Sequence, residues 1–181
     1  LPEVFNIMSR RPAPLVSRDC VFPIEERMRA DGKPKTALNE SDVRAGVRKA
    51  KSMGCQGIVI SFLNAYRNPD HEEQAAQIVR EEDPSLFVFT SNEVWPLIRE
   101  FERTITTVMN GYVHPKLKHY LTSLQQTLKK EGVKATPMIA KSNGGVMSAE
   151  RAITGCAHVM LSGPAMGVMG ACHVANLAAE K

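Results

Sequence analysis

The stretch that decides the fold is Gly57-Ile58-Val59-Ile60-Ser61-Phe62-Leu63, a short apolar run rich in β-branched residues. It is shorter than an ordinary helix, and it lacks the alternation of a strand that has one wet face. A continuous apolar run of this length is typical of a strand that is covered on both faces, as in a parallel sheet. The run therefore predicts an α/β protein with a parallel or mixed sheet and flanking helices.

Helical patterns lie on both sides of this strand. Before it, residues 38–42 supply capping side chains and Gly54 is a natural helix stop. Between them the apolar residues fall on one helical face: Val43, Val47, Ala50 and Met53. After it, residues 68–82 read as a helix with acids in the first turn, and residues 86–90 read as the next strand. This alternation of helix and strand predicts a βαβ unit.

The remaining chain divides into a lead-in and a C-terminal part. We expect residues 1–37 to form an irregular lead-in with an antiparallel strand pair, because Asp31-Gly32 is a hairpin turn signal. Residues 38–135 form the α/β lobe, which ends in two helices or in one long helix kinked near residues 111–115. Residues 136–181 hold a short strand, glycine-containing turns and a connecting helix.

Composition excludes several classes of protein. The 181 residues carry a net charge of +4 and scattered basic side chains without interleaved aromatics, so we expect no nucleic-acid partner. No apolar run is long enough to cross a membrane, so we expect a cytoplasmic protein. The four cysteines lack zinc or disulfide spacing and are predicted to be buried thiols, and we expect no metal ligands. Because the chain begins at Leu1, without an initiator Met, we expect it to be a piece of a longer protein.

Asn143-Gly144-Gly145 is the first candidate ligand loop. Asn and Gly tolerate positive φ and let a phosphate or another backbone come close. Such a loop at the carboxyl end of a parallel strand would lie where these sheets bind ligands. The alternative, which two glycines alone favour, is a tight turn without a ligand.

Ser162-Gly163-Pro164 opens the last helix and is the second candidate. Its free N–H groups can hold an anion. However, Gly163, Gly167 and Gly170 share one face with Ala171, and each glycine inside a helix costs roughly 1 kcal/mol relative to Ala. We therefore favour close packing of this face against another helix over direct contact with phosphate.

A polar stripe runs along the helical pattern in residues 100–114. Its members recur on one helical face: Arg103, Thr107, Asn110 and His114. They can line a cleft in which Arg103 grips an anionic or carbonyl substrate. A buried polar network between helices, or a solvated face, is the favoured alternative. The histidines lack metal spacing; His71 is expected to be exposed, and His173 to be packed or at the surface.

Five motifs in fixed order give the chain a family resemblance. They are FLNAYRNPDHE at residues 62–72, EFERT at 100–104, NGYV at 110–113, KSNGGVMS at 141–148 and LSGPA at 161–165. In order and spacing they resemble the hydantoinase A, 5-oxoprolinase and acetone carboxylase β-subunit family over nearly the whole chain. Met166, Met169 and Phe101 depart from the family's usual residues, which puts the subfamily in doubt but not the family.

The resemblance implies a part of an actin/Hsp70-like (ribonuclease H-like) ATPase fold. Family members use ATP and Mg²⁺ to phosphorylate the carbonyl of a cyclic amide before ring opening, and a second hydantoinase subunit is an implied partner. The family's Asp-x-Gly-Gly-Thr phosphate motifs are absent from these 181 residues. By analogy, residues 163–171 resemble the helix that connects to the second phosphate loop and packs across the interdomain hinge.

Together these features predict an internal segment of an ATP-dependent hydantoinase/5-oxoprolinase-like enzyme, inactive alone and with no cofactor of its own. The residues expected nearest to the cofactor are Asn143, Gly144, Ser162 and Gly163, and no residue is assigned to catalysis or to a metal. A stand-alone, non-catalytic binding or scaffold domain of the same fold is the alternative. A sugar-kinase-like enzyme that lost its motifs is a third hypothesis.

Overall fold

The parallel strand pair predicted from residues 57–63 and 86–90 forms the centre of the larger lobe. The computed structural model describes residues 5–8 and 13–179. In it, β3 (Gly57–Ile60) pairs in parallel with β4 (Phe87–Thr90), with Gly57 opposite Phe87. The connection between them is α2 (Asp70–Glu82), so the three elements make the predicted βαβ unit. The mixed α/β fold class is confirmed.

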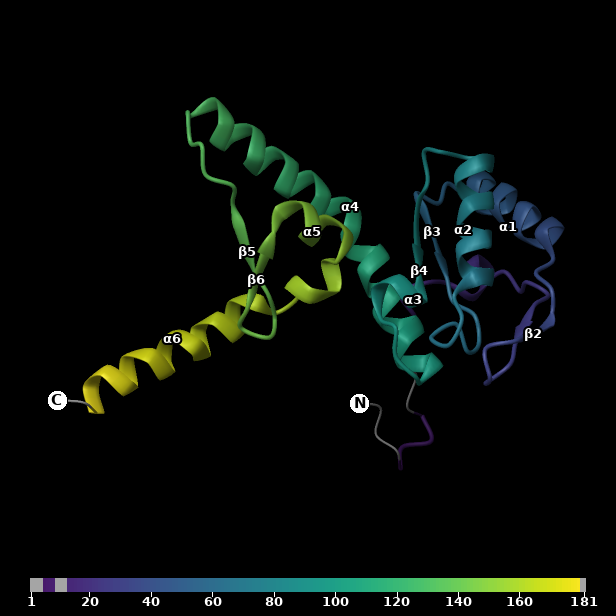
Figure 1. Cartoon of the computed structure of the whole chain (residues 1–181), viewed down its shortest axis with the longest axis horizontal. Helices are drawn as coiled ribbons and strands as arrows, with labels where there is room; N and C mark the ends of the chain where they lie inside the picture. The colour runs from purple at the N-terminus through teal and green to yellow at the C-terminus, as the bar shows by residue number, and fades with distance from the viewer. Residues whose placement is uncertain (1–4, 9–12, 180–181) are drawn as a thin grey trace.

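Helices cover both faces of this strand pair (Figure 1). On one face, α1 (Glu40–Ser52) and α2 pack against each other and bury an apolar core. That core contains Val43, Val47, Ile60, Ala75, Ile78 and Val79. On the other face lies α4 (Glu100–Lys130), where an added Cβ at Gly111 would come within 3.0 Å of Val59. The absence of a side chain at Gly111 thus permits the close approach of α4 to β3.

Short elements complete the N-terminal part. Asn39 caps α1 by accepting hydrogen bonds from the backbone N–H groups of Ser41 and Asp42. The predicted strand pair is present as β1 (Arg27–Met28) and β2 (Pro34–Thr36), antiparallel around Gly32, which has φ +82°. A short 3₁₀ turn, η1 (Arg18–Cys20), precedes it, and α3 (Ser91–Val94) follows β4. Met53 was predicted on the buried face of α1, but it lies just past the last turn and is exposed.

The segment 100–130 is one continuous helix, which decides between the two alternatives for it. Pro115 lies inside α4 and removes one backbone hydrogen bond, but the helix does not end there. The buried residues on either side of Pro115 explain why. Gly111 and His114 pack against the strand pair, and Leu121 is buried further along, so tertiary contacts hold the helix through the proline.

A second, smaller lobe is built on the far half of α4. It consists of β5 (Met138–Ala140), β6 (Val146–Ser148), α5 (Ala149–Thr154), the 3₁₀ turn η2 (Cys156–Val159) and α6 (Ser162–Ala179). Ser148 caps α5, as predicted, by accepting from the N–H of Arg151. In Figure 1, α6 extends away from the rest of the molecule.

One expectation for this lobe is corrected, and a second stays a prediction because it finds no partner among the described residues. Strand β6 was not predicted, and β5 pairs with it in antiparallel fashion, so the Asn143–Gly145 turn is not at the end of a parallel strand. The glycine face of α6 was expected to pack tightly against a helix. Within the described part of the chain, nothing lies within 4 Å of a Cβ built at Gly163, Gly167 or Gly170.

The burial of the cysteines differs in part from expectation. Cys156 is buried, Cys20 and Cys55 are half-buried, and Cys172 is exposed, so only Cys156 matches the prediction of a fully buried thiol.

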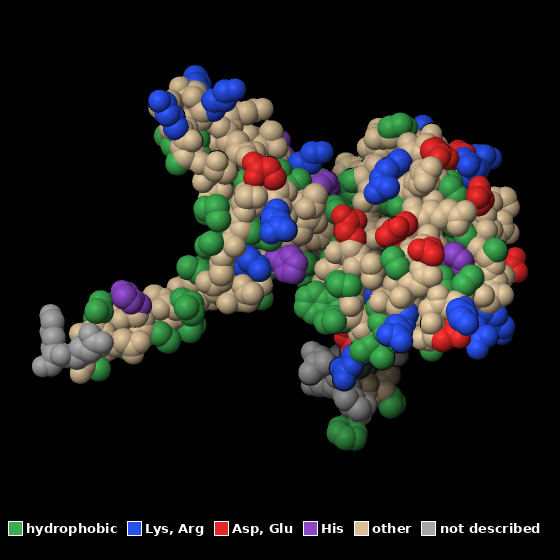
Figure 2. Space-filling model, viewed as in Figure 1, with side chains coloured by type: hydrophobic (Ala, Val, Ile, Leu, Met, Phe, Trp, Pro, Cys, Tyr) green, Lys and Arg blue, Asp and Glu red, His purple; other side chains and the backbone are tan. Residues whose placement is uncertain are grey.

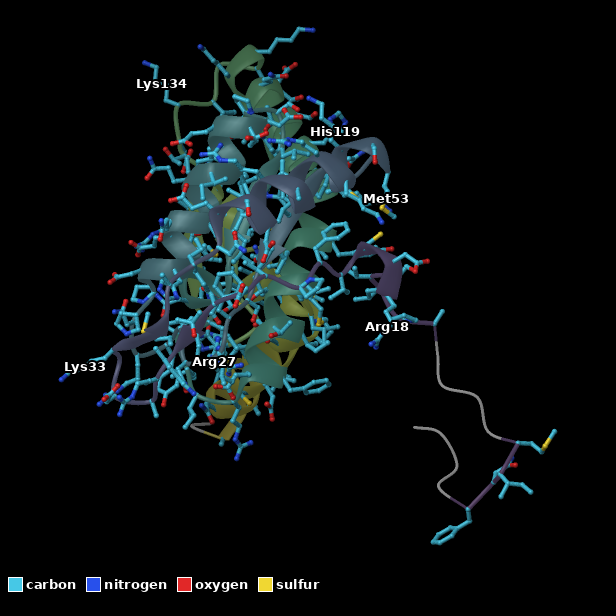
Figure 3. All side chains as sticks on the ribbon, turned by 90° about the vertical axis from the view of Figure 1, so that its right-hand side faces the viewer. Arg18, Arg27, Lys33, Met53, His119 and Lys134 are labelled. Carbon is cyan, nitrogen blue, oxygen red and sulfur yellow. The ribbon has the colours of Figure 1, made fainter. Side chains whose placement is uncertain are left out.

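Figure 2 shows Lys and Arg side chains at the tip of α4 and, over the larger lobe, intermingled with Asp and Glu. In Figure 3, Lys134 lies near the top of the view and Lys33 projects from the lower left side. In residues 5–8 and 13–179, we find no helix with the length and hydropathy needed to cross a membrane.

Candidate functional site

The carboxyl ends of β3 and β4 converge on one buried carboxylate, that of Glu72 in the first turn of α2. Its Oε1 accepts from the backbone N–H of Phe62 at 2.8 Å and from the hydroxyl of Ser91 at 2.6 Å. Its Oε2 accepts from the N–H of Asn92 at 2.9 Å. Burial raises the pKa of Glu72 above its ordinary value, and these three hydrogen bonds and the charge of Arg103 act in the opposite direction.

Arg103, in the first turns of α4, completes this cluster and is likewise fully buried. It donates from Nε to Ser91 Oγ at 2.8 Å, and from its terminal nitrogens to the carbonyls of Phe62 at 2.8 Å and Leu97 at 3.0 Å. Its guanidinium carbon lies 5.9 Å from the ring centroid of Tyr66. Every group of this cluster is therefore engaged within the chain.

The cluster fixes the loops at the edge of the sheet where parallel sheets bind ligands. Glu72 and Arg103 together hold the strand end at Phe62, the start of α3 and the chain at Leu97. This arrangement supports the predicted buried network rather than a cleft in which Arg103 grips a substrate. The chemistry available to Glu72 and Arg103 is positioning of neighbouring backbone, because neither side chain reaches the surface.

The rest of the polar stripe joins the two lobes. Asn110 donates from Nδ2 to the carbonyl of Thr154 and accepts from the N–H of Ala157, each at 2.9 Å. His114 Nδ1 lies 2.8 Å from the carbonyl of Ile153, so that nitrogen carries the proton. Thr107 donates to the carbonyl of Arg103 within α4. These contacts anchor α5 and η2 on α4.

The turn at Asn143–Gly145 uses its own polar groups. Gly144 has φ +82° and donates its N–H to the carbonyl of Lys141 at 3.1 Å. The N–H of Gly145 donates to Asn143 Oδ1, also at 3.1 Å. A Cβ at Gly144 would lie 3.2 Å from Met169, so the turn rests against the middle of α6. Both glycine N–H groups are thus already bonded inside the turn.

Ser162 and Gly163 lie at the first residues of α6, and Gly163 has open space beside it. The Asn143–Gly145 turn contacts α6 at Met169, about two helical turns beyond Ser162. The structure therefore places the two candidate loops on the same small lobe but does not bring them together into one pocket. Their assignment to the cofactor stays a prediction.

Sequence reasoning missed the most heavily bonded residues. Glu72 was named only as part of a helix start and of a family motif, and Ser91 was not named, because their hydrogen-bond partners come from other segments of the chain. A buried strand followed by a helix whose first turn carries an acid was the available signal. His71 was expected to be exposed, but it is buried and its Nδ1 lies 2.9 Å from Glu26 Oε2, contributed by the segment just before β1. No group of three or more metal-ligating side chains occurs in the ranges that the structure describes.

Comparisons with known proteins agree along the chain. Residues 103–181 match the family model described as hydantoinase/oxoprolinase, and residues 1–83 match that of the hydantoinase/oxoprolinase N-terminal region. Caprolactamase subunit alpha of Pseudomonas jessenii is 35% identical over 155 residues, which cover 83% of this chain and 22% of that protein. The 5-oxoprolinase of Saccharomyces cerevisiae is 34% identical over an alignment of 196 residues, gaps included, which covers 93% of this chain and 15% of that protein.

Among solved structures, nucleotide-free acetone carboxylase superposes with a TM-score of 0.86 at 30% identity. The match covers 94% of this chain and 24% of the acetone carboxylase chain. The chain thus spans about a quarter or less of each of these relatives.

Proposed function

This chain belongs to the hydantoinase/oxoprolinase family, and from that premise we propose that it is a segment of a longer ATP-dependent enzyme that opens a cyclic amide. The likeness to caprolactamase subunit alpha over 83% of the chain carries the cyclic-amide part of the proposal. The superposition on acetone carboxylase, whose carboxylation is ATP-dependent, over 94% of the chain supports the ATP dependence. The sequence likeness to caprolactamase and to 5-oxoprolinase, both named for cyclic amides, favours hydrolysis over carboxylation for this chain.

The role of the segment in such an enzyme follows from its buried polar groups. The Glu72–Ser91–Arg103 cluster holds the carboxyl edge of the strand pair, and Asn110 and His114 hold the small lobe on α4. A substrate or nucleotide that bound near this edge would meet loops fixed in advance, which lowers the ordering cost of binding. The segment is therefore a positioning element of the site.

The described residues do not by themselves fit a nucleotide. The N–H groups of Gly144 and Gly145 are bonded inside their turn, and the start of α6 lies apart from that turn. We therefore place the principal phosphate contacts, and the Mg²⁺ that accompanies ATP, in parts of the longer protein outside residues 1–181. Asn143, Gly144, Ser162 and Gly163 remain candidates for secondary contacts.

A partner subunit is part of the proposal. The caprolactamase relative is named as an alpha subunit, which supports a multi-subunit enzyme for the longer protein. Copurification of the longer polypeptide with a second, different chain tests this point independently of the substrate.

The test of function is ATP turnover by the longer polypeptide that contains these residues, with its partner subunit if one copurifies. Phosphate release is measured with 5-oxoproline, hydantoin or caprolactam, and ring opening is followed in parallel by mass spectrometry. We expect phosphate release that depends on the lactam and matches the amount of ring-opened product. Phosphate release that instead requires a ketone and bicarbonate would replace hydrolysis by carboxylation.

The alternative, a stand-alone binding or scaffold domain, predicts a different result. A scaffold would bind a partner protein but would not hydrolyse ATP in the presence of any of these substrates. Absence of ATP-dependent chemistry in the longer polypeptide, in the presence of its partner subunit, would favour the scaffold.

A further inference from the structure

Two of the cysteines, Cys20 and Cys55, lie next to each other although they come from different segments. Cys20 ends η1, and Cys55 lies between the end of α1 and the start of β3. Both residues line the same cavity, which has a volume of about 650 Å³. Burial raises the pKa of the Cys55 thiol, and the charge and the hydrogen bond of the neighbouring Cys20 raise it further. Both thiols are free and only half-buried, so a small oxidant can reach them.

The backbone on each side holds the two thiols in place. The N–H of Cys20 donates within the η1 turn at 2.9 Å, and the N–H of Cys55 donates to the carbonyl of Ala50 at 3.0 Å. Just beyond Cys20, the side chain of Phe22 lies 3.5 Å from the position that a Cβ would take at Gly46, inside α1. The approach of the two cysteines is therefore part of the packing of this segment on α1.

A covalent bond between them needs only a local shift. The two sulfur atoms of a disulfide lie about 2.0 Å apart, which is closer than two hydrogen-bonded thiols. The 3₁₀ turn η1 contains no buried residue, so it can move toward Cys55 without opening the core. In Figure 3, Arg18 of η1 and Met53 at the end of α1 lie on the same side of the view.

We propose that Cys20 and Cys55 are a site of reversible oxidation and form a disulfide when a peroxide is present. One thiolate attacks hydrogen peroxide, the O–O bond breaks, and hydroxide leaves, so that the cysteine becomes a sulfenic acid. The second thiolate attacks the sulfenic sulfur, the S–O bond breaks, and a second hydroxide leaves as the S–S bond forms. The two thiols together give up two electrons and two protons, and the peroxide becomes two molecules of water.

The disulfide ties the segment before β1 to the connection between α1 and β3. The closed loop contains β1, β2 and α1. Such a cross-link restricts the unfolded chain, so it stabilises a fold that accepts the bond without strain. The proposal goes beyond the proposed function and does not rest on it.

The experiment is peptide mapping of the longer polypeptide without reductant. The protein is reduced with dithiothreitol, freed of it, treated with hydrogen peroxide, and blocked with iodoacetamide. Trypsin should release residues 19–27, which contain Cys20, and residues 52–67, which contain Cys55. Equal amounts of isotopically light and heavy protein are mixed before oxidation, so that links within one molecule are distinguished from links between two.

We expect these two peptides to appear joined, with a mass two hydrogen atoms below their sum, and to separate again after dithiothreitol. The link should be kept in Cys172→Ser, whose replaced thiol is exposed on α6, and should be absent from Cys55→Ser. The buried Cys156 serves as the internal control, because it should stay unoxidised while the protein is folded. The link is sought first in the unsubstituted protein, so the test does not depend on the folding of a variant.

Three results would overturn the proposal. The first is that Cys20 and Cys55 remain thiols, or become sulfinic or sulfonic acids, without the link. The second is that either cysteine pairs mainly with Cys172 or with another thiol. The third is that the joined peptides are mostly light–heavy pairs, which would come from two molecules.

Thermal unfolding gives an independent readout. The oxidised protein should unfold at a higher temperature than the reduced protein, and dithiothreitol should remove the difference. Cys55→Ser should show no such shift. An equal or lower midpoint for the oxidised protein would contradict a bond that the fold accepts. Neither readout involves ATP turnover, so failure of the cyclic-amide activity and failure of the disulfide proposal are distinguishable.

Discussion

Arg103 and Glu72 meet on a single hydroxyl oxygen: Arg103 Nε donates to Ser91 Oγ at 2.8 Å, and that hydroxyl donates to Glu72 Oε1 at 2.6 Å. Both charged side chains are fully buried. Removing one member of a buried charged pair leaves the other uncompensated, which typically costs about 3–5 kcal/mol. We call this Arg103–Ser91–Glu72 chain of hydrogen bonds the relay, and we expect its loss to lower the stability of the fold strongly.

We expect Arg103→Met to lower the free energy of unfolding by about 3–5 kcal/mol, measured by urea denaturation. The matched control is Arg99→Met, because Arg99 is exposed and its ion pair with Glu102 lies at the surface at 3.6 Å. Such surface changes usually stay within about 0.5 kcal/mol. Equal effects of the two substitutions would contradict the role of the relay.

Adding Glu72→Gln to Arg103→Met should recover part of the loss, because the double variant no longer buries an unpaired charge. The coupling energy from the double-mutant cycle should be roughly 0.5–3 kcal/mol. Additive effects of the two substitutions would mean that the two side chains act independently.

The strand pair and its helices could be predicted because they rest on local patterns: the apolar run at 57–63, and the helix start at residues 68–70. Burial of Glu72 and His71 could not, because it depends on Ser91 and Glu26, which only the folded chain brings close. Strand β6 was missed because three residues next to a turn carry too little periodicity. The polar stripe was recognised from helical spacing, but its partners in α5 and η2 were not visible in the sequence.

Asp83 predicts an acid-dependent loss of stability. Its bonds with Lys51, at 2.8 Å, and with Ser85 lower its pKa from 3.8 to about 2. The folded state therefore binds fewer protons than the unfolded state between these values, so this contribution is present above pH 3.8 and is lost as the pH falls through about 2. We expect Asp83→Asn to flatten the decline of unfolding free energy in this window, measured by urea titrations at several pH values. Lys51→Met should flatten it partly, and an unchanged slope in both variants would contradict the assignment.

Two glycines should respond to alanine in opposite directions. A Cβ at Gly57 would overlap the ring of Phe87, which is itself held against Phe89 and His114, so Gly57→Ala should destabilise the fold by about 1–3 kcal/mol. A Cβ at Gly46, inside α1, would make an ordinary contact with Phe22 at 3.5 Å, and Gly46→Ala should stabilise by roughly 0.5–1 kcal/mol. Thermal unfolding of both variants checks the pair, and stabilisation by Gly57→Ala would contradict the close packing of β3 on β4.

The cysteines should differ in reactivity. Burial raises the pKa of Cys156 to about 11, and its thiol donates to the carbonyl of Ile153, whereas Cys172 is exposed on α6. Because the thiolate is the nucleophile, iodoacetamide at mildly alkaline pH should modify Cys172 of the 181-residue chain well before Cys156. Peptide mapping by mass spectrometry gives the two rates, and comparable rates would mean that the packing around α5 and η2 opens readily.

The central proposal, that these residues are the positioning segment of a longer ATP-dependent enzyme, is tested most directly by calorimetric titration of ATP with Mg²⁺. The titration is made into the 181-residue chain and into the longer polypeptide that contains it. We expect binding to the longer polypeptide and none to the 181 residues, since the turn at Asn143–Gly145 satisfies its own N–H groups. Tight, Mg²⁺-dependent binding by the 181 residues alone would contradict the proposal and make that turn, with Ser162 and Gly163, the nucleotide site.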